Sequence, residues 1–241
     1  MAESGEVRAP GVSAGGTLLC QDVGTNESLL AQVSKRLEAV SPSRVYRGGA
    51  ELYRQGAVAD EVFFVERGLV KLTRAEEDGQ ELIVDLRFPG SLLGVAPALT
   101  RRRHPLTAVA LTKSHVRRVE AKAFCRLLQS DTRFSWHVHQ LSGHEISHHL
   151  ARVAQLGCLT ARHRLEQLFR QLITADGTPA VSRDFLLRMP LKQWEVAQLI
   201  AVTPAYLSRL LNQLELEGLI RRERGAFAIP EPRRLWRWKD A

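Results

Sequence analysis

The spacing of apolar residues changes along the chain, and each change marks a different kind of secondary structure. Apolar residues recur at helical spacing over Leu29–Leu37, which predicts a short amphipathic helix. From about residue 44 to residue 120, short β-branched or alternating runs such as Val62–Val65 lie between glycine-rich turns, one of them at Asp78-Gly79. Regularly spaced short strands of this kind are typical of a β-sandwich or barrel. Helical spacing returns from Ala121 onward.

A long segment without proline, residues 131–157, carries apolar residues at coiled-coil spacing. Two triplets make up this pattern, with a one-residue slip between them: Phe134, Val138 and Leu141, then Ile146, Leu150 and Val153. A long exposed helix with an apolar seam usually needs a partner helix. We therefore expect this segment to hold two copies of the chain together as a homodimer.

The same segment contains five histidines, of which His144 and His148 are four residues apart and could chelate a metal ion. A pH-responsive interface is a second interpretation. We favour a solvated helix face, because no carboxylate or cysteine completes a set of metal ligands. No metal site is expected.

Residues 191–213 predict two short helices separated by a tight turn. Thr203-Pro204 is a strong start for the second helix, because a hydroxyl caps the helix and proline suits its first position. Leu207, Leu210 and Leu211 form the buried side of that helix. Its outward face presents short polar side chains and one arginine, as a helix that reads DNA bases does. An ordinary helical hairpin in an enzyme core is the alternative.

Residues 219–229 follow as a two-strand hairpin with a glycine turn and basic edges. Such a wing suits contact with DNA phosphates. The spacing, the helix cap and this hairpin agree on a winged helix-turn-helix. The candidate DNA-binding residues are Thr203, Tyr206, Ser208, Arg209, Asn212, Arg221, Arg222 and Arg224.

The chain resembles the CRP/FNR-type transcription regulators over about residues 40–235. Four stretches carry the resemblance: RGGAELYRQGAVADEVFFVERGLVKL, FPGSLLG, LARVAQLGCLTARHRLEQLFRQL and QWEVAQLIAVTPAYLSRLLNQLELEGLI. The resemblance implies an α+β fold with an N-terminal jelly-roll-like β-domain, a long dimerisation helix and a C-terminal winged helix-turn-helix. It also implies DNA binding through Ser208 and Arg209.

The domain boundaries expected on this basis divide the chain into four parts. They are a flexible tail (1–27), a cyclic-nucleotide-binding-like effector domain (28–130), a dimerisation helix (131–157) and a winged helix-turn-helix DNA-binding domain (158–241). The seam residues of the dimerisation helix are expected to be Val138, Leu141, Ile146, Leu150 and Val153.

Two residues of the helix-turn-helix depart from the family. Ala201 stands where the turn usually has glycine, at a cost on the order of 1 kcal/mol if its backbone is left-handed. Ala205 stands where the family commonly has a base-reading glutamate, four residues before Arg209. The operator half-site is therefore left open.

In family members that bind cyclic nucleotides, a glutamate holds the ribose hydroxyl and an arginine pairs with the cyclic phosphate. Val95 stands at the glutamate position here, and the arginine position falls near His104. Cyclic AMP is therefore not the expected effector, because valine leaves the ribose hydroxyls unpaired. The candidate effector pocket comprises Gly90, Leu92, Leu93, Gly94, Val95, Arg103 and His104.

The cysteines, Cys20, Cys125 and Cys158, are far apart and give neither a disulfide framework nor an iron–sulfur cluster. We interpret Cys125 and Cys158 as buried structural thiols. Haem stays open as a cofactor, since histidine and cysteine are available, although nothing selects an axial pair. A cyclic-nucleotide- or haem-responsive regulator with the same DNA-binding mechanism is the alternative function.

The net charge of +8 points to a polyanionic partner. The expected partners are a double-stranded DNA operator and a second copy of the chain, with RNA polymerase left open. A cytoplasmic location is expected, because neither a signal peptide nor a membrane span is apparent. A β-barrel ligand-binding module or cupin-like enzyme is a weaker reading, since the strand region holds only His104 and His115. We therefore expect no enzymatic activity.

Overall fold

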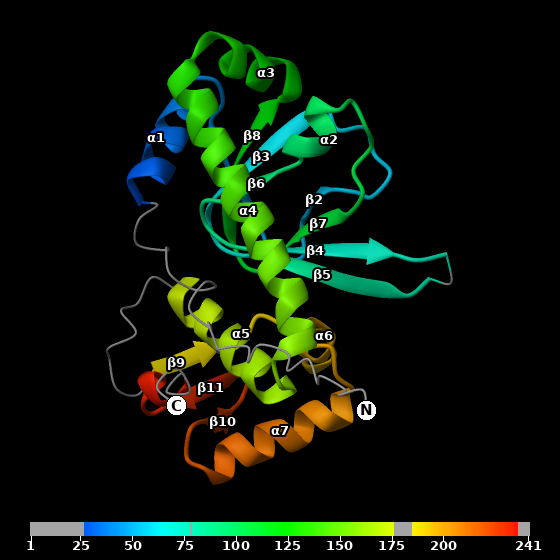
Figure 1. Ribbon diagram of the computed structural model, residues 1–241, viewed down its shortest axis with the longest axis vertical. Helices are drawn as coiled ribbons and strands as arrows, with labels where there is room; N and C mark the ends of the chain where they lie inside the picture. Colours follow the sequence, from blue (N-terminus) through cyan, green and yellow to red (C-terminus); the bar gives the residue numbers. More distant parts are fainter. Residues whose placement is uncertain (1–26, 78, 176–184, 236–241) are drawn as a thin grey trace, which may run out of the picture.

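The computed structural model describes residues 27–77, 79–175 and 185–235, so the expected N-terminal tail lies almost entirely outside the described residues. A β-domain and a smaller, mainly helical domain lie at the two ends of one long helix, α4 (Thr132–Cys158), as Figure 1 shows. The expected α+β architecture is confirmed. No helix among the described residues is long and apolar enough to cross a membrane.

The β-domain is built from two four-stranded sheets, and the predicted β-sandwich is confirmed. The first sheet has the order β1-β8-β3-β6 and the second has the order β2-β7-β4-β5. The bounds of the first sheet's strands are β1 Ser43–Tyr46, β8 Ser114–Glu120, β3 Glu61–Arg67 and β6 Leu92–Leu93. Those of the second are β2 Glu51–Tyr53, β7 Thr107–Ala110, β4 Val70–Ala75 and β5 Glu81–Arg87.

Strand β3 is apolar on both faces, because both faces are covered. Phe63 and Val65 pack between the two sheets, whereas Val62 and Phe64 pack against helices. Strands β4 and β5 form the hairpin predicted from Asp78-Gly79, with Ala75 paired to Glu81 and Gly79 in the left-handed region at a φ of 81°.

Four helices cover the outer face of the first sheet: α1 (Glu27–Glu38), α2 (Val95–Leu99), α3 (Ala121–Ser130) and the first half of α4. Helix α4 begins at a capped end, where the Asp131 carboxylate accepts a hydrogen bond from the Phe134 backbone N–H at 3.0 Å. The ring of Phe134 then meets that of Phe124 edge to face, with centroids 5.6 Å apart. These contacts fix the start of α4 on the β-domain.

The second domain contains α5 (Ala161–Ala175), α6 (Gln193–Leu199) and α7 (Pro204–Leu216) over a three-stranded sheet of order β10-β11-β9. The two wing strands, β10 (Arg221–Glu223) and β11 (Ala226–Ile229), were predicted. The third strand, β9 (Phe185–Arg188), was not predicted, and it pairs antiparallel with β11. The segment that joins α5 to β9, residues 176–184, lies outside the described residues.

One apolar cluster contains residues of both domains. Ile83 and Leu86 of strand β5 pack among the buried residues of the helical domain. At the same junction Lys71 Nζ lies 2.7 Å from the largely buried carboxylate of Glu195 on α6. The Gln198 side chain accepts from the Ile83 N–H and donates to the Glu81 carbonyl, both at 3.1 Å, so it pairs with the edge of β5 as a short strand would. The helical domain is thus held against the β4–β5 hairpin.

Candidate nucleic-acid interface

Helices α6 and α7 cross at a turn with a strained backbone. Ala201 has a φ of 52°, the left-handed conformation expected for the position that is usually glycine. Its N–H donates to the Gln198 carbonyl at 3.0 Å, and the Val202 N–H donates to the Ala197 carbonyl at 3.0 Å. These bonds close the end of α6 and turn the chain sharply into α7.

The start of α7 has the geometry that its sequence predicts. The Thr203 hydroxyl accepts a hydrogen bond from the Tyr206 N–H at 3.2 Å, and Pro204 occupies the first turn. Leu207, Leu210 and Leu211 are buried, as predicted. The far end of α7 is held by Arg162 of α5, whose guanidinium donates to both carboxylate oxygens of Glu217 at 2.6 Å. These bonds from Arg162 hold the pKa of Glu217 below its usual value.

The outward face of α7 carries an arginine, Arg209. Arg209 is exposed and makes no hydrogen bond or ion pair within the described residues. Ser208, one residue earlier, is already engaged: its hydroxyl donates to the Pro204 carbonyl at 3.0 Å and accepts from Gln193 Nε2 at 2.7 Å. Arg209 is therefore available to a partner, whereas the Ser208 proton is not.

The wing arginines differ in what they contact. The guanidinium of Arg222 reaches back to α7, where it donates to Asn212 Oδ1 at 2.5 Å and lies 3.5 Å from the Glu215 carboxylate. Arg221 pairs with Glu223 at 3.2 Å on the exposed edge. Arg222 thus ties the wing to α7 instead of projecting from it. Arg224 is exposed and, among the described residues, makes no side-chain bond.

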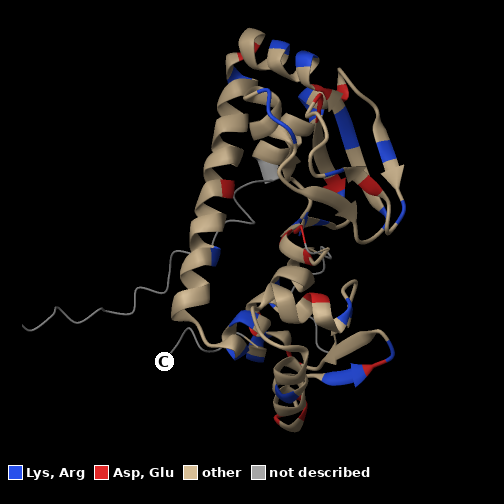
Figure 2. Cartoon of the chain, turned by 90° about the vertical axis from the view of Figure 1, so that its right-hand side faces the viewer, with Lys and Arg blue, Asp and Glu red and all other residues tan. Residues whose placement is uncertain are grey.

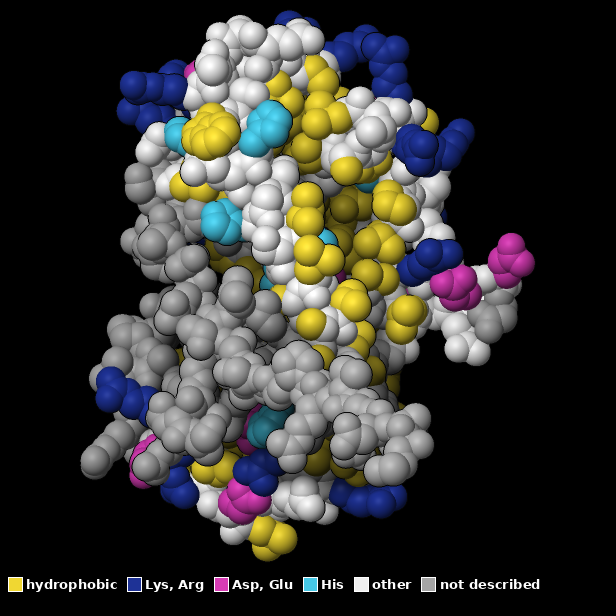
Figure 3. Space-filling view, viewed as in Figure 1, with side chains coloured by type: hydrophobic (Ala, Val, Ile, Leu, Met, Phe, Trp, Pro, Cys, Tyr) yellow, Lys and Arg dark blue, Asp and Glu magenta, His cyan; other side chains and the backbone are white. Residues whose placement is uncertain are grey.

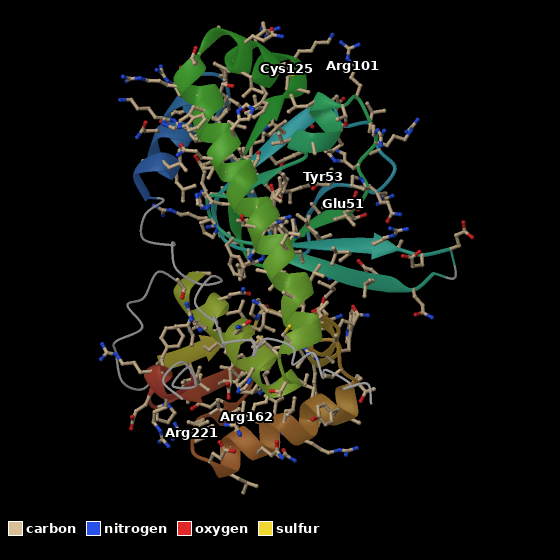
Figure 4. The ribbon with its side chains drawn as sticks, viewed as in Figure 1. Glu51, Tyr53, Arg101, Cys125, Arg162 and Arg221 are labelled. Atoms are coloured by element: carbon tan, nitrogen blue, oxygen red, sulfur yellow. The ribbon has the colours of Figure 1, made fainter. Side chains whose placement is uncertain are left out.

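The charges of this end of the molecule are mixed. Figure 2 shows basic residues on the wing with acidic ones beside them. The labelled Arg221 lies far from the labelled Tyr53 in the β-domain, as Figure 4 shows. The β-domain and the wing are connected through α4 and through the junction of the two domains.

The two apolar triplets of α4 lie on different sides of the helix. Phe134 and Val138 are buried against the chain's own β-domain, and Leu141 packs on the same cluster. The expectation that Val138 and Leu141 belong to an intermolecular seam is corrected by this packing. The one-residue slip between the two triplets therefore coincides with the change from the buried side of α4 to its exposed side.

The second triplet, by contrast, has no partner among the described residues: Ile146, Leu150 and Val153 have exposed fractions of 61%, 66% and 69%. They belong to a longer stripe with alternating three- and four-residue steps, in which every residue is exposed: Trp136, His139, Gly143, Ile146, Leu150, Val153 and Gly157. We call these seven residues the α4 stripe. Figure 3 shows apolar side chains gathered along this side of α4. Sequence reasoning missed Trp136, although the heptad spacing from Gly143 points to it.

The predicted effector pocket contains several core residues. Leu92 is buried on the helix-covered side of the first sheet, and Leu93 is buried between the sheets. Both side chains are thus packed in the core of the β-domain, and their place in an effector pocket stays a prediction. Gly90 and Gly94 have positive φ values of 94° and 78° and form the turns on either side of β6. Val95 begins α2 and packs against the helix-covered core.

His104 fills the space beneath Gly94. It is 3% exposed, and its ring is stacked on that of Tyr53 with centroids 3.8 Å apart. A Cβ atom on Gly94 would lie 3.0 Å from His104 Cε1, so glycine permits this close approach. His104 Nδ1 has no hydrogen-bond partner within the described residues. Burial lowers the pKa of His104 and raises that of Tyr53. Arg103 is exposed and donates to the Gly56 carbonyl at 2.7 Å.

The histidines of α4 are not all on a solvated face. His149 Nε2 lies 3.0 Å from Arg87 Nη2, and His148 Nε2 lies 3.8 Å from the buried carboxylate of Asp85. Arg152 donates to the same carboxylate at 3.1 Å. Burial alone would raise the pKa of Asp85, but the neighbouring His148, Arg87 and Arg152 outweigh it and keep that pKa below its usual value.

Neither a metal cluster nor a buried pair of thiols is found among the described residues. No group of three or more His, Cys, Asp or Glu side chains there is arranged to hold a metal ion. Cys125 is half-buried in α3, where Figure 4 labels it. Cys158 is exposed at the end of α4, so its interpretation as a buried structural thiol is wrong.

Comparison with known proteins gives two family matches. Residues 43–131 match the family described as "Cyclic nucleotide-binding domain", and residues 151–238 match the "Crp-like helix-turn-helix domain". The chain is 24% identical over 217 residues to the nitrogen fixation regulation protein FixK of Azorhizobium caulinodans, covering 90% of this chain and 83% of that protein.

Two solved structures have the same fold. The structure of FixK2 from Bradyrhizobium japonicum has a TM-score of 0.68 at 21% identity and covers 81% of this chain and 96% of its own. A transcriptional regulator of the CRP family from Thermus thermophilus has a TM-score of 0.67 at 22% identity and covers 82% and 97%.

Proposed function

The chain belongs to the CRP/FNR family of DNA-binding transcription regulators, and we propose that it binds an inverted-repeat operator as a two-fold homodimer. The observation that carries the proposal is the outward face of α7, where Arg209 is exposed and makes no hydrogen bond or ion pair within the described residues. The planar guanidinium of an arginine can pair with O6 and N7 of a guanine in the major groove. Arg209 is therefore the residue that reads a base.

The remaining contact residues have different roles. Thr203, Tyr206 and Ser208 lie at the start of α7 and approach the DNA with it, with Asn212 one turn further along. Arg221 and Arg224 of the wing meet phosphates, which fix the orientation on DNA but carry no sequence information. Arg222 acts mainly by holding the wing to α7, since its side chain is engaged with Asn212 and Glu215.

The dimer forms along the α4 stripe. An apolar seam with heptad spacing is buried when two such helices pack side by side. Gly143 and Gly157 add no side chain to the stripe and let the two helices approach closely. The two-fold axis then places the two α7 helices about 34 Å apart, one turn of DNA, so that they read an inverted repeat.

Each part of the chain then has its own task. We assign residues 28–130 to the effector domain, 131–157 to the dimerisation helix and 158–241 to the DNA-binding domain; the expected tail lies, except for residue 27, outside the described residues. The protein works in the cytoplasm, has no catalytic activity, and acts on transcription by binding DNA; contact with RNA polymerase is a further expected interaction.

Cyclic AMP is not the effector. Val95 offers the ribose hydroxyls no acceptor, and the interior beneath Gly94 is filled by the stacked rings of His104 and Tyr53. Calorimetric titration of the purified protein with cyclic AMP should give no heat of binding at micromolar concentrations. Measurable micromolar affinity would contradict this assignment. A haem or nucleotide effector would be detected by mass spectrometry of molecules that copurify with the protein.

The test of the proposed function is selection of bound sequences from random double-stranded DNA with the full-length protein. We expect an inverted repeat with a guanine in each half-site and a salt-dependent mobility shift on the selected DNA. Binding without any sequence preference, or enrichment of a site with no symmetry, would contradict it.

A further inference from the structure

The first turn of α7 is apolar on its exposed side. Pro204, Ala205 and Tyr206 are all exposed, and none carries a charge or an amide. The hydroxyl of Thr203 is used as the helix cap. The Tyr206 side chain is 43% exposed. The end of α7 that points toward a DNA groove in a helix-turn-helix thus presents a methyl group, a pyrrolidine ring and an aromatic ring.

In the first turn, the Tyr206 hydroxyl at the end of its ring is polar, and the other polar side chains of this face lie one turn later. Arg209 follows Ala205 by four residues, so the two side chains are neighbours on one helix face. Ser208 cannot donate to a base, because its proton goes to the Pro204 carbonyl. Asn212 keeps only its amide N–H groups, because its oxygen accepts from Arg222. Within the described residues, the unengaged hydrogen-bonding groups nearest to Ala205 on this face are the Arg209 guanidinium, the Asn212 amide N–H groups and the Tyr206 hydroxyl at the end of its ring.

An apolar side chain can distinguish bases in the major groove by one feature, the 5-methyl group of thymine. Opposite a cytosine or an adenine, the same side chain would leave a base amino group without a hydrogen-bond partner, which costs binding energy. The thymine methyl group is therefore the base feature that the small apolar side chain beside Arg209 suits best.

We propose that Ala205, flanked by the ring of Tyr206, reads the 5-methyl group of a thymine within one or two base pairs of the guanine contacted by Arg209. The inference rests on the proposed function, because it requires α7 to enter the major groove. It adds that a methyl contact from Ala205 takes the place of the hydrogen bonds made by the glutamate that the family commonly has at this position.

The test replaces single thymines of the selected operator by deoxyuridine, which removes only the methyl group and keeps every hydrogen-bonding group. Burying one methyl group stabilises binding by about 0.8 kcal/mol, so its removal should weaken binding of the full-length protein about four-fold. We expect this loss at one thymine in each half-site and less than about two-fold change at the others.

Two variants assign the effect to Ala205. In Ala205→Gly the methyl contact is absent, so deoxyuridine and thymine operators should bind with equal affinity. In Tyr206→Phe the ring is retained, so the four-fold preference for thymine should persist. Both positions are exposed in the first turn, and circular dichroism checks that each variant folds.

The outcomes separate the inference from the function on which it rests. If the protein selects an inverted repeat but no deoxyuridine substitution weakens binding, or if the half-site contains no thymine beside the guanine, the methyl contact is wrong and the proposed function stands. A thymine preference that survives in Ala205→Gly also overturns it. If no operator is selected at all, the proposed function fails and the inference fails with it.

Discussion

Single residues decide how α7 is placed and what it can read. Ala201 is a case where the backbone conformation and the residue type conflict, because its φ of 52° favours glycine. The side chain is exposed, so it gains little packing energy in return. The conformation persists because the Ala197 and Gln198 carbonyls accept hydrogen bonds across the turn.

We predict that Ala201→Gly stabilises the protein by about 1 kcal/mol, since glycine adopts the left-handed conformation without strain. The melting temperature should rise by about 2–4 °C in a thermal scan at fixed protein concentration. Ala205→Gly, in the first turn of α7, is the control and should not stabilise. An unchanged or lower melting temperature for Ala201→Gly would mean that the turn carries no such strain.

We predict that Arg209 and Arg224 respond differently to mutation, because the proposal has Arg209 read a base and Arg224 contact a phosphate. Arg209→Ala should cost about 1–3 kcal/mol on the operator, relax the preference at one guanine in each half-site and leave random DNA nearly unaffected. Arg224→Ala should weaken all sequences alike and reduce the salt slope by about 1 per lost phosphate contact. Mobility shifts at several salt concentrations measure both, and equal loss on operator and random DNA for Arg209→Ala would exclude base reading.

At the scale of elements, helix α4 differs on its two sides, one packed against the β-domain and the other exposed. Its first half packs on the β-domain through Phe134 and Val138, and its stripe faces outward. The same helix also holds Arg152, which bridges the Asp85 carboxylate of β5 and the Leu199 carbonyl of α6 at 3.1 and 3.3 Å. Helix α4 therefore contacts both the β-domain and the DNA-binding domain, and its exposed stripe is the surface proposed for the second copy.

We predict that Leu150→Asp produces monomers, because it places a charge in the proposed seam. The fold of the monomer should survive, since Leu150 is exposed. Operator affinity should fall about a hundred-fold or more, because the two half-sites are no longer bound together. Leu216→Asp is the control, a still more exposed leucine at the end of α7, and should stay dimeric in light scattering. A Leu150→Asp protein that remains dimeric would move the interface elsewhere.

His149 makes the stability of the α4 junction depend on pH. Arg87 donates to His149 Nε2, which requires the neutral ring. Burial, together with the charge of Arg87, lowers the pKa of His149, although Asp85 and Glu145 act in the opposite direction and His148 lies beside it. The unfolded chain, with a histidine pKa of about 6.5, therefore takes up the proton first.

The contribution of His149 to stability is thus complete above about pH 6.5 and is lost as the pH falls through the lower pKa of the folded state. We predict a melting temperature that falls by a few degrees between neutral pH and about pH 5. His149→Gln, which accepts the same hydrogen bond without titrating, should flatten this fall. His144→Gln, at an exposed position of the same helix, should leave it unchanged. If the melting temperatures of both variants fall equally steeply with decreasing pH, His149 is excluded as the cause.

At the scale of the whole molecule, the β-domain and the DNA-binding domain are joined by buried contacts. Glu195 is 5% exposed and shares its carboxylate between Lys71 of β4 and the Lys192 backbone N–H, both at 2.7 Å. A mutation that breaks this contact in the β-domain should therefore also lower the local stability of α6.

We predict that Lys71→Met destabilises the protein on the order of 2 kcal/mol, less than the about 3–5 kcal/mol typical of a broken buried pair, because Lys192 still satisfies one oxygen of Glu195. Hydrogen exchange should become faster in α6 as well as in β4. The double variant Lys71→Met/Glu195→Gln should recover part of the loss. Faster exchange confined to β4 would show that the ion pair does not join the two domains.

The sequence by itself determined the local structure of the DNA-binding end. The Thr203-Pro204 cap depends on contacts within a few residues, so local chemistry specifies it, and the spacing of the leucines indicates which side of α7 is buried. The left-handed position of Ala201 was indicated by the family resemblance. The β4–β5 hairpin follows from its turn in the same way. Strand β9 was missed because Phe185–Arg188 is too short to stand out and is defined only by its pairing with β11.

The tertiary structure decided which surfaces are free. Both triplets of α4 have the same apolar spacing, and only packing against α1 and α3 buries Phe134 and leaves Leu150 exposed. The stacking of His104 on Tyr53, the engagement of Arg222 with Asn212 and the ion cluster around Asp85 join residues distant in sequence. No periodicity encodes such pairs, because they exist only once separate elements have packed together.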